Sequence, residues 1–338
     1  MSDFQASKAL VLDLHRALDP APAEAAADVL ARYTTGDWHF RGMHPFNEQT
    51  GPEAAARVFW EPCKRAFTPF QRRQNIFFAG RNFMDGYRTE WVCSMGHLLG
   101  LFDSPWLGIR PTRKMSFLRY AEFHRIEEGR IAETALFVDV MSVMHQAGLR
   151  VFPESTGATV ITPGPQTQDG LLFDAHPEEE GRTTMALIQR MIDRLVATGV
   201  RTLKSDLELD WHDDMLWWGP AGIGAAYTHE RYLEQHCRPF EEGLEFLTHH
   251  GHVLEFAEGS YGGFFGYPTM RMKSKGGYMG LASAGEFEAE MRIVDLYRRA
   301  GDKLAENWIF IDNLHFLEQL GVDLLDRQQR LSGGASSS

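Results

Sequence analysis

The sequence predicts an α+β fold of two tandem lobes, in each of which helices are followed by a strongly curved antiparallel sheet that wraps a cavity. Three observations predict it: an internal repeat, the same order of helical and alternating patterns in both copies, and a change of composition between them. Solenoid repeat units are about 20 to 50 residues long, and these copies are far longer, so each should bury its own core.

The two copies are related by one constant offset in residue number, the offset that carries Asp139 onto Asp312. It is clearest in the segments 129–149 and 301–323, and we call it the repeat offset. Two separated blocks share it, which chance rarely produces. The pairs are Glu133/Glu306, Phe137/Phe310, Asp139/Asp312, Gln146/Gln319, Gly148/Gly321, Arg119/Arg292, Arg125/Arg298, Asp37/Asp210, Trp38/Trp211, His39/His212, Gly51/Gly224, Arg65/Arg238 and Phe67/Phe240.

The first copy begins with helical patterns, followed by segments of strand character. Helices are expected at 7–18, 22–33 and 52–67, and strands at 37–40, 75–79, 88–99 and 115–125. The second copy should repeat this order, with a helix at 183–198, a strand near 207–213 and a helix at 227–244.

The closing segment of each copy is predicted to be a strand that runs into a short helix. In the second copy, residues 303–312 alternate between polar and apolar, and Leu314, Leu317 and Leu320 then follow at helical spacing. Because side chains alternate along a strand, Asp312 should share a mostly apolar face with Glu306, Trp308 and Phe310. In the first copy, Glu133, Ala135, Phe137 and Asp139 should do the same.

Composition sets the boundaries between the lobes. A stretch rich in Pro, Gly, Thr and Gln indicates a linker, and the chain ends in Ser and Gly. The predicted division is lobe one at 1–151, linker at 152–178, lobe two at 179–330 and a disordered tail at 331–338.

The overall composition is that of a globular protein in aqueous solution. The 338 residues are 43% hydrophobic and carry a formal net charge of −12, which argues against nucleic-acid and anionic-membrane partners. We expect neither a signal peptide nor a membrane span, and three scattered cysteines without a CxxC motif favour a cytoplasmic location. The cysteines should be small buried hydrophobes rather than nucleophiles.

Several motifs resemble a known family. The first lobe carries PTRK, FHRIEEGRIAET and QAG, and the second carries WWGPAGIG, GYMGLASAG and LYRRAGDKLAENWIFIDNLHFLEQLGVD. Together they resemble tandem SnoaL-like polyketide cyclases, often labelled ester cyclases, of the nuclear transport factor two-like superfamily. The resemblance implies a cone-shaped α+β barrel (cystatin-like) in each lobe, no cofactor, and an aspartate at Asp139 or Asp312 as general acid/base. Lys275 stands where a histidine is expected.

Asp139, Asp312 and His97 are the predicted catalytic residues. A carboxylate in an apolar cavity has a raised pKa and can exchange protons near neutral pH. An aspartate before a helix is equally well explained as an N-cap. His97 should share a strand face with Trp91, Cys93 and Met95 and could reach the pocket of Asp139, or could be a satisfied core histidine.

A further set of residues is expected to bind substrate or to support the site. Arg119 and Arg292 should form structural pairs with Glu133 and Glu306, or instead hold a substrate carboxylate or phosphate. Trp308, Trp217 and Trp218 suit a pocket for a ring-shaped or sugar-like ligand, although core packing explains them nearly as well. His44 should lie at the pocket rim. No metal site is expected, because His249, His250 and His252 match no ligand spacing.

These observations favour a cofactor-independent enzyme that transfers a proton next to a carbonyl of a small molecule, in an aldol-type cyclisation, elimination, hydration or isomerisation. Two alternatives stay open: a non-catalytic small-molecule binding protein, and an epoxide or ester hydrolase on the same fold. The fused lobes should form a pseudo-dimer within one chain, and the sequence leaves a homo-oligomer open.

Overall fold

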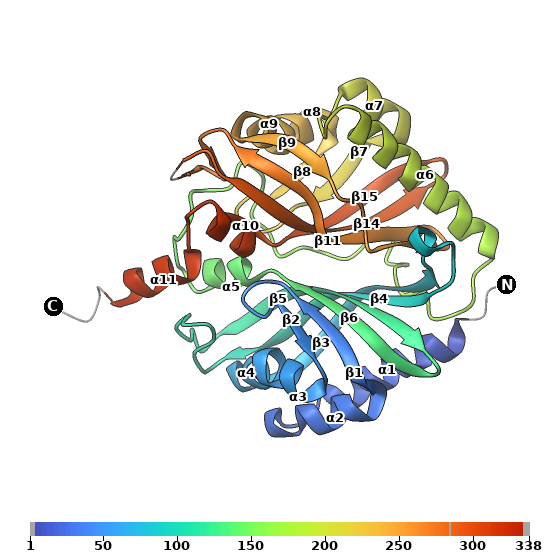
Figure 1. Cartoon of the computed structure of the whole chain (residues 1–338), viewed down its shortest axis with the longest axis vertical. Helices are drawn as coiled ribbons and strands as arrows, with labels where there is room; N and C mark the ends of the chain where they lie inside the picture. Colours follow the sequence, from blue (N-terminus) through green and yellow to red (C-terminus); the bar gives the residue numbers. More distant parts are fainter. Residues whose placement is uncertain (1–3, 284, 334–338) are drawn as a thin grey trace.

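The computed structural model describes residues 4–283 and 285–333 and shows two lobes of the same architecture (Figure 1). The sheet of lobe one has the strand order β2-β1-β6-β5-β4-β3. Its elements are α1 (Gln5–Leu18), η1 (Ala23–Ala25), α2 (Ala26–Tyr33), β1 (Thr34–Gly42), β2 (Glu48–Thr50), α3 (Pro52–Ala55), η2 (Ala56–Trp60), α4 (Glu61–Ala66), β3 (Phe67–Arg81), η3 (Phe83–Asp85), β4 (Glu90–Phe102), β5 (Met115–Glu127), β6 (Arg130–Val138) and α5 (Val140–Gln146).

Lobe two repeats this plan, with the strand order β10-β11-β14-β15-β7-β8 and β9 paired to β11. Its elements are α6 (Glu178–Ala197), α7 (Lys204–Asp210), β7 (Trp211–Trp218), β8 (Ala225–Tyr227), α8 (Thr228–Tyr232), η4 (Leu233–Cys237), α9 (Arg238–Gly243), β9 (Leu244–His249), β10 (Leu254–Glu258), β11 (Tyr261–Ser274), β12 (Gly277–Tyr278), β13 (Leu281–Ala282), β14 (Glu288–Ala300), β15 (Lys303–Ile311) and α10 (Asn313–Gln319); α11 (Leu324–Gly333) follows.

The predicted repeat is visible element by element. Under the repeat offset, β5, β6 and α5 coincide at both ends with β14, β15 and α10. The α+β class is therefore confirmed, with two differences of detail. Each sheet contains one parallel pair, β1–β6 and β15–β7, and in the described part of the chain each sheet is open rather than closed into a barrel.

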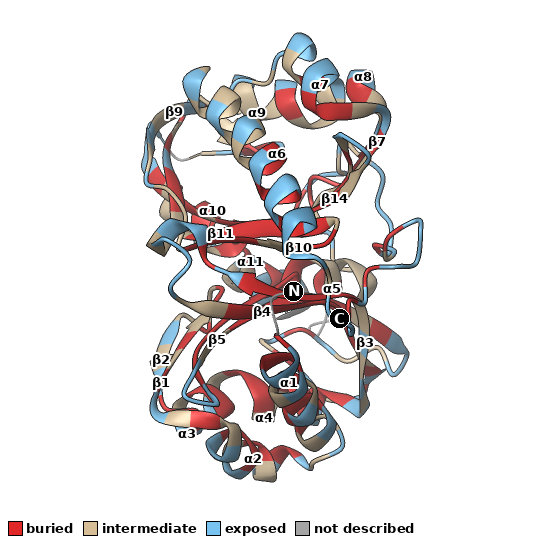
Figure 2. Ribbon diagram, turned by 90° about the vertical axis from the view of Figure 1, so that its right-hand side faces the viewer, coloured by how far each residue is buried: buried red, intermediate tan, exposed pale blue. Residues whose placement is uncertain are grey.

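The outer faces of the two sheets pack against each other, while α1–α4 and α6–α9 cover the inner faces at opposite ends of the molecule (Figure 2). We call the contact between the outer faces the seam. Its buried residues are Met43, Ile76, Phe78, Trp91, Cys93, Met95, Ala121, Phe123, Ala135, Phe137, Leu172, Leu254, Phe256, Tyr261, Phe265, Val294, Leu296, Trp308 and Phe310. The single chain thus contains the predicted pseudo-dimer.

Short local signals begin and end the repeated helices. Asp139 and Asp312 are the N-caps of α5 and α10, accepting hydrogen bonds from the Ser142 and His315 amides. Gly148 and Gly321 follow the two helices with φ of 77° and 80°, the left-handed conformation that commonly ends a helix.

Three segments, 207–213, 152–178 and 331–338, can be compared with what the sequence predicted. The strand expected near 207–213 is instead the end of helix α7 followed by β7, although apolar and polar residues alternate from Leu207 onward. Asp210, the last residue of the helix, pairs with Arg190 and Arg194 of α6. The segment 152–178 is ordered against both lobes: Ala158 pairs with Ala225, and Leu171 pairs with Phe77. The tail expected at 331–338 falls largely outside the described residues, and α11 extends to Gly333.

The cysteines behave as expected, because Cys63, Cys93 and Cys237 are all buried and free. Among the described residues, no helix combines the length and the apolar character that crossing a bilayer requires.

Candidate functional site

A cavity of about 130 Å³ lies inside lobe two, between the inner face of the sheet and the helices α6, α7 and η4–α9. Alternation along two adjacent strands builds its floor. β14 directs Met291, Ile293, Asp295 and Tyr297 into the cavity, and β15 directs Asn307, Ile309 and Ile311. Trp217 of β7, which the sequence suggested as a ligand-binding residue, lines the same space.

Asp295 is a buried carboxylate on the floor of this cavity, whose lining also includes Asp206, Asp210 and Glu241. Its Oδ1 accepts a hydrogen bond of 2.8 Å from the Asn307 amide, and the Tyr297 hydroxyl also donates to it. The arginines that line the cavity have other partners: Arg194 pairs with Asp210, and Arg201 with Glu241. Because burial is compensated only by neutral donors, the pKa of Asp295 rises from 3.8 to about 7.

The groups around Asp295 are neutral and polar. His236 stacks on Trp217 at a centroid distance of 4.1 Å, and burial lowers its pKa to about 3, so the imidazole is uncharged. Burial also raises the pKa of Tyr232 well above 10 and that of Cys237 to about 12, which keeps both groups protonated. Asp295 therefore lies among hydrogen-bond donors that hold their protons.

Lobe one carries a carboxylate at the equivalent position, Glu122, in different surroundings. Arg72 donates to Glu122 Oε2 at 2.5 Å, and His15 Nε2 lies 3.2 Å from the same oxygen. Burial raises the pKa of Glu122, but Arg72 and the imidazoles outweigh it and hold that pKa well below the usual range. Glu122 is thus a permanently charged member of a buried network, whereas Asp295 can change charge near neutral pH.

The predicted catalytic aspartates lie where the two lobes meet, at the edge of the seam. Asp139 Oδ2 accepts from the backbone amide of Ala221 in lobe two, and Asp312 Oδ2 accepts from the amide of His44 in lobe one, both at 2.9 Å. Burial raises the pKa of both carboxyl groups, and the backbone donors and the nearby Arg119 and Arg292 oppose that rise.

Both aspartates border a space of only about 10 Å³ between the starts of α5 and α10, which is about the volume needed for one water. Their hydrogen bonds give each aspartate a structural function as a helix cap and a link between lobes. Their predicted catalytic role remains a hypothesis.

A second cavity, of about 250 Å³, brings three predicted residues together at the same edge: His97, Arg119 and Asp139. The linker residues 158–162 form part of its wall. Burial and Arg119 lower the pKa of His97 to about 4. Arg119 donates to the carbonyls of Trp218 and Gly219 and lies over the ring of Phe310, but its buried Nε has no partner among the described residues.

The predicted arginine–glutamate pairs exist with a different arginine. Glu133 pairs with Arg125 and Arg41, and Glu306 pairs with Arg298. We expected Arg119 and Arg292 to form ion pairs with these glutamates, and that expectation was wrong. The strand register places Arg125 opposite Glu133 and Arg298 opposite Glu306.

Arg292 instead contacts Asp312 at 3.2 Å and Asn47 of the other lobe. It therefore joins the inter-lobe contacts rather than the pair within the sheet.

The remaining predicted residues are Trp308 and Trp218, on the seam side of lobe two, and His44 of lobe one, which contacts lobe two. Trp308 is buried in the seam and donates to the Pro163 carbonyl. The indole of Trp218 lies 3.5 Å from Glu306 Oε2, and His44 Nδ1 lies 3.5 Å from Glu318. The strand face that we expected to line a pocket is therefore the face that packs against the other sheet.

The sequence reasoning missed Asp295, although the repeat contained a signal for it. The repeat offset carries Glu122 onto Asp295, so each lobe has an acid at one strand position. Both faces of these strands are buried, so alternation alone could not show which face met the cavity.

Comparison with known proteins gives matches of structure only. No family model matches the chain, and no curated protein sequence matches it. Among solved structures, a protein named as a SnoaL-like polyketide cyclase from Jannaschia sp. CCS1 is 19% identical, with a TM-score of 0.34, over 43% of this chain and 93% of its own. AclR from Streptomyces galilaeus, named as a hydroxylase, is 16% identical, with a TM-score of 0.34, over 42% of this chain and 94% of its own.

An NTF2-like protein from Burkholderia xenovorans LB400 is 12% identical, with a TM-score of 0.32, over 41% of this chain and 97% of its own. The Jannaschia and Burkholderia proteins bear family names that the sequence resemblance implies, and each of the three structures matches less than half of this chain.

Proposed function

We propose that the protein is an enzyme that transfers a proton next to a carbonyl group of a small molecule, and that Asp295 is its general base and acid. The observation that carries this proposal is the buried Asp295 carboxyl group, bound by neutral donors at the wall of a cavity. A base with a pKa near the working pH is ionised often enough to accept a proton and acidic enough to return it.

The proton transfer conserves its atoms and charge. The ionised Asp295 takes the proton from the carbon next to the carbonyl, the C–H bond breaks, and its electron pair moves onto the carbonyl oxygen as an enolate. Tyr232 keeps its proton and can donate a hydrogen bond to that oxygen. Return of the proton from Asp295 to the same or a neighbouring carbon completes exchange or isomerisation, without a metal or an organic cofactor.

The size of the cavity limits the substrate. Its volume of about 130 Å³ is close to that of a cavity of about 150 Å³ known to accept benzene. The aromatic wall of Trp211, Trp217 and Tyr232 suits a compact, partly apolar molecule. We therefore expect small ketones, keto-sugars or β-keto esters rather than polycyclic aromatic substrates.

The test is α-proton exchange followed by NMR. The protein is incubated in heavy water with a panel of small ketones, keto-sugars and β-keto esters, beside the variants Asp295→Asn, Asp139→Asn and Asp312→Asn. We expect exchange that Asp295→Asn abolishes and the other two variants keep. Exchange that survives in Asp295→Asn but is lost in Asp139→Asn or Asp312→Asn would move the catalytic site to the edge of the seam.

A second function, small-molecule binding without turnover, is favoured by the cavity of His97, Arg119 and Asp139. The unpartnered Nε of Arg119 could donate to a ligand carboxylate there. Absence of exchange, with ligands that raise the melting temperature of the wild type but not of Arg119→Met, would support this function. Incorporation of labelled solvent oxygen into product would instead indicate an epoxide or ester hydrolase.

A further inference from the structure

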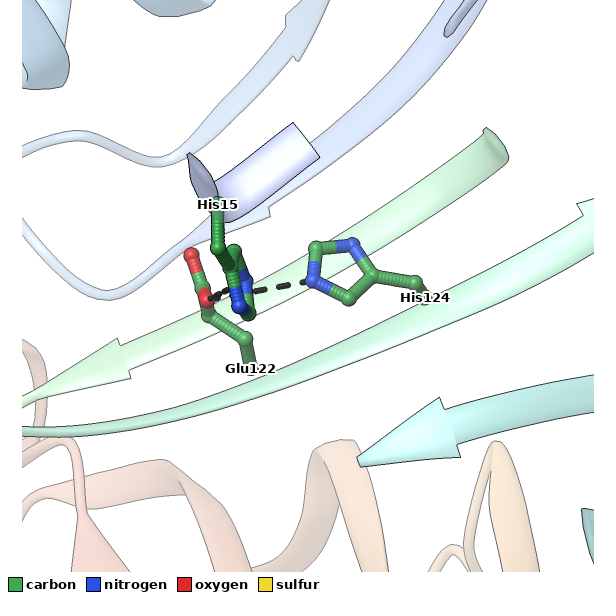
Figure 3. A group of neighbouring side chains, drawn as sticks. All are labelled: His15, Glu122 and His124. Atoms are coloured by element: carbon green, nitrogen blue, oxygen red, sulfur yellow. Dashed lines mark hydrogen bonds and ion pairs between the residues drawn. The ribbon is translucent and has the colours of Figure 1, made fainter. Parts of the chain in front are cut away.

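Three side chains converge in the interior of lobe one, far from the cavity of lobe two. His15 comes from α1, and Glu122 and His124 lie two residues apart on β5 (Figure 3). All three are buried. One ligand atom from each lies within 4.8 Å of those of the other two: His15 Nε2 is 3.2 Å and His124 Nε2 is 3.8 Å from Glu122 Oε2.

These separations are close to those of a metal's ligands. Bonds of about 2.0–2.2 Å to histidine nitrogen and carboxylate oxygen, at angles between octahedral and tetrahedral, place neighbouring ligand atoms about 3.0–3.4 Å apart. Small side-chain movements would bring all three atoms to bonding distance of one ion. Two imidazoles and one carboxylate on one side of an ion leave further positions open, as in the sites that hold Zn²⁺ or non-haem Fe²⁺.

A second observation points to a ligand. His124 Nε2 is buried and has no partner within hydrogen-bond distance among the described residues, because Glu122 Oε2, at which it is directed, lies 3.8 Å away (Figure 3). A buried polar atom without a partner is unfavourable and rare in folded proteins, so its persistence calls for an explanation. A metal ion between the three side chains would supply the missing partner.

The other nitrogen of His124 is already held, because Nδ1 lies 2.9 Å from Thr134 Oγ1. Metal-binding histidines usually have such an outer partner, which fixes the ring and its tautomer. His15 Nδ1 lies 3.4 Å from the Gln74 amide nitrogen, which is a donor, so His15 Nε2 would have to release its proton when the ion binds.

The repeat supplies an internal comparison. At the positions equivalent to His15, Glu122 and His124, lobe two carries Ile188, Asp295 and Tyr297. Both lobes build the same helix and strand there, so the fold does not require the two histidines. A specific role in lobe one accounts for their presence better than a folding requirement does.

Arg72 is the group that opposes a cation here, because it donates to Glu122 at 2.5 Å. The guanidinium is also held by Asp19 at 3.2 Å and lies over the ring of Tyr120. These contacts let it stay beside the site as an outer partner of the carboxylate, at an electrostatic cost to metal affinity.

We propose that lobe one binds a divalent first-row transition metal ion through His15 Nε2, the Glu122 carboxylate and His124 Nε2. The proposal is independent of proton transfer in lobe two. Because its ligands come from α1 and β5, the ion would fasten the first helix to the sheet.

Metal binding by untagged full-length protein tests this proposal. After stripping with chelator, the protein is titrated with Zn²⁺ by calorimetry and with Co²⁺ by visible absorption, both as the native protein and after refolding with the metal, so that slow entry is covered. We expect one equivalent of metal, a higher melting temperature, and a Co²⁺ spectrum typical of nitrogen and oxygen ligands.

Variants separate the site from adventitious binding. His15→Gln and His124→Phe should each weaken binding by at least about 100-fold, above the 10–100-fold cost of losing an outer partner. His250→Gln, at a half-exposed histidine remote from the site, should leave it unchanged, and Arg72→Met should tighten it. Absence of one-to-one binding by the folded wild type, or binding retained in the double variant His15→Gln/His124→Phe, would overturn the proposal.

Discussion

Asp295 and Glu122 occupy one strand position in two copies of the same fold, and their neighbours give them opposite properties. Arg72 and His15 hold Glu122 in its charged form, whereas Asn307 and Tyr297 give Asp295 only neutral hydrogen bonds. The cost of burying a charged carboxylate is therefore compensated at Glu122 in lobe one and is left uncompensated at Asp295 in lobe two. A carboxyl group that is buried without a charged partner lowers the stability of the folded protein when it ionises. Such a cost to stability is common at residues that serve function.

The first prediction concerns the pH dependence of stability. Asp295 has a pKa of 3.8 when unfolded and about 7 when folded, so the native state binds more protons between these values. Stability should fall as the pH rises through this window, with the whole penalty, on the order of 4 kcal/mol, present above pH 7.

Asp295→Asn removes that penalty while keeping the shape of the side chain. Urea unfolding should show the variant more stable than wild type at pH 8, with the difference much smaller at pH 5. The exposed Asp302→Asn serves as the control and should change neither value. A variant less stable than wild type at pH 8 would show that Asp295 is held as a paired carboxylate.

At the scale of secondary-structure elements, the strand-to-helix joints explain how the lobes are held together. Asp139 and Asp312 each cap their own helix and accept an amide from the opposite lobe. The arrangement is repeated in both directions, as expected of two related lobes that face each other about an approximate two-fold axis.

We predict that Asp139→Ala and Asp312→Ala each destabilise the protein by about 2–4 kcal/mol, because each loses a helix cap and a charge-assisted hydrogen bond between lobes. Chemical denaturation at pH 8 measures the effect, with the exposed Asp13→Ala of α1 as a near-neutral control. These two substitutions should therefore lower the stability at pH 8, whereas Asp295→Asn should raise it. A change no larger than that of an ordinary surface substitution, about 0.5 kcal/mol, would contradict the structural role.

The corrected ion pairs lead to a further prediction. Arg298 and Glu306 are both buried, so Arg298→Met should leave an unpaired buried carboxylate and cost about 3–5 kcal/mol. Arg125→Met should cost less, because Arg125 is partly exposed and Glu133 keeps Arg41. Urea unfolding of the two variants compares them directly, and equal costs would contradict this assignment of partners.

At the scale of the whole molecule, the seam makes one body of two lobes. Phe265 of β11 contacts Trp91, Phe123 and Phe137 of lobe one, with ring centroids 5.1–5.9 Å apart. Phe78 and Phe256 pack against each other at 4.6 Å. Burial of aromatic side chains on this scale should couple the unfolding of the lobes.

We expect a single cooperative transition, with coincident curves from tryptophan fluorescence and far-ultraviolet circular dichroism. Phe265→Ala should shift both curves together by about 3–5 kcal/mol, since it leaves a cavity in the seam. The exposed Phe287→Ala provides the control. Separation of the wild-type curves into two transitions would show that the lobes unfold independently.

The sequence predicted most of the fold and less of the candidate sites, for a physical reason. The repeat offset locates both lobes, and the closing strand and helix were placed nearly to the residue. Both faces of β15 are buried, so the pattern of apolar residues did not indicate which face lines the cavity. Long-range contacts were also inaccessible, since His15 meets Glu122 across 107 residues and Ala221 meets Asp139 across 82.

The measurement that most directly tests the central claim is the pKa of Asp295, obtained by NMR titration of ¹³C-labelled aspartate carboxyl groups. Asp295→Asn identifies the resonance by its loss. We expect a carboxyl group that titrates at about pH 7 and whose pKa shifts when a small ketone binds. A value near the ordinary 3.8, unchanged by every ligand, would contradict the role of Asp295 as the acid and base of lobe two.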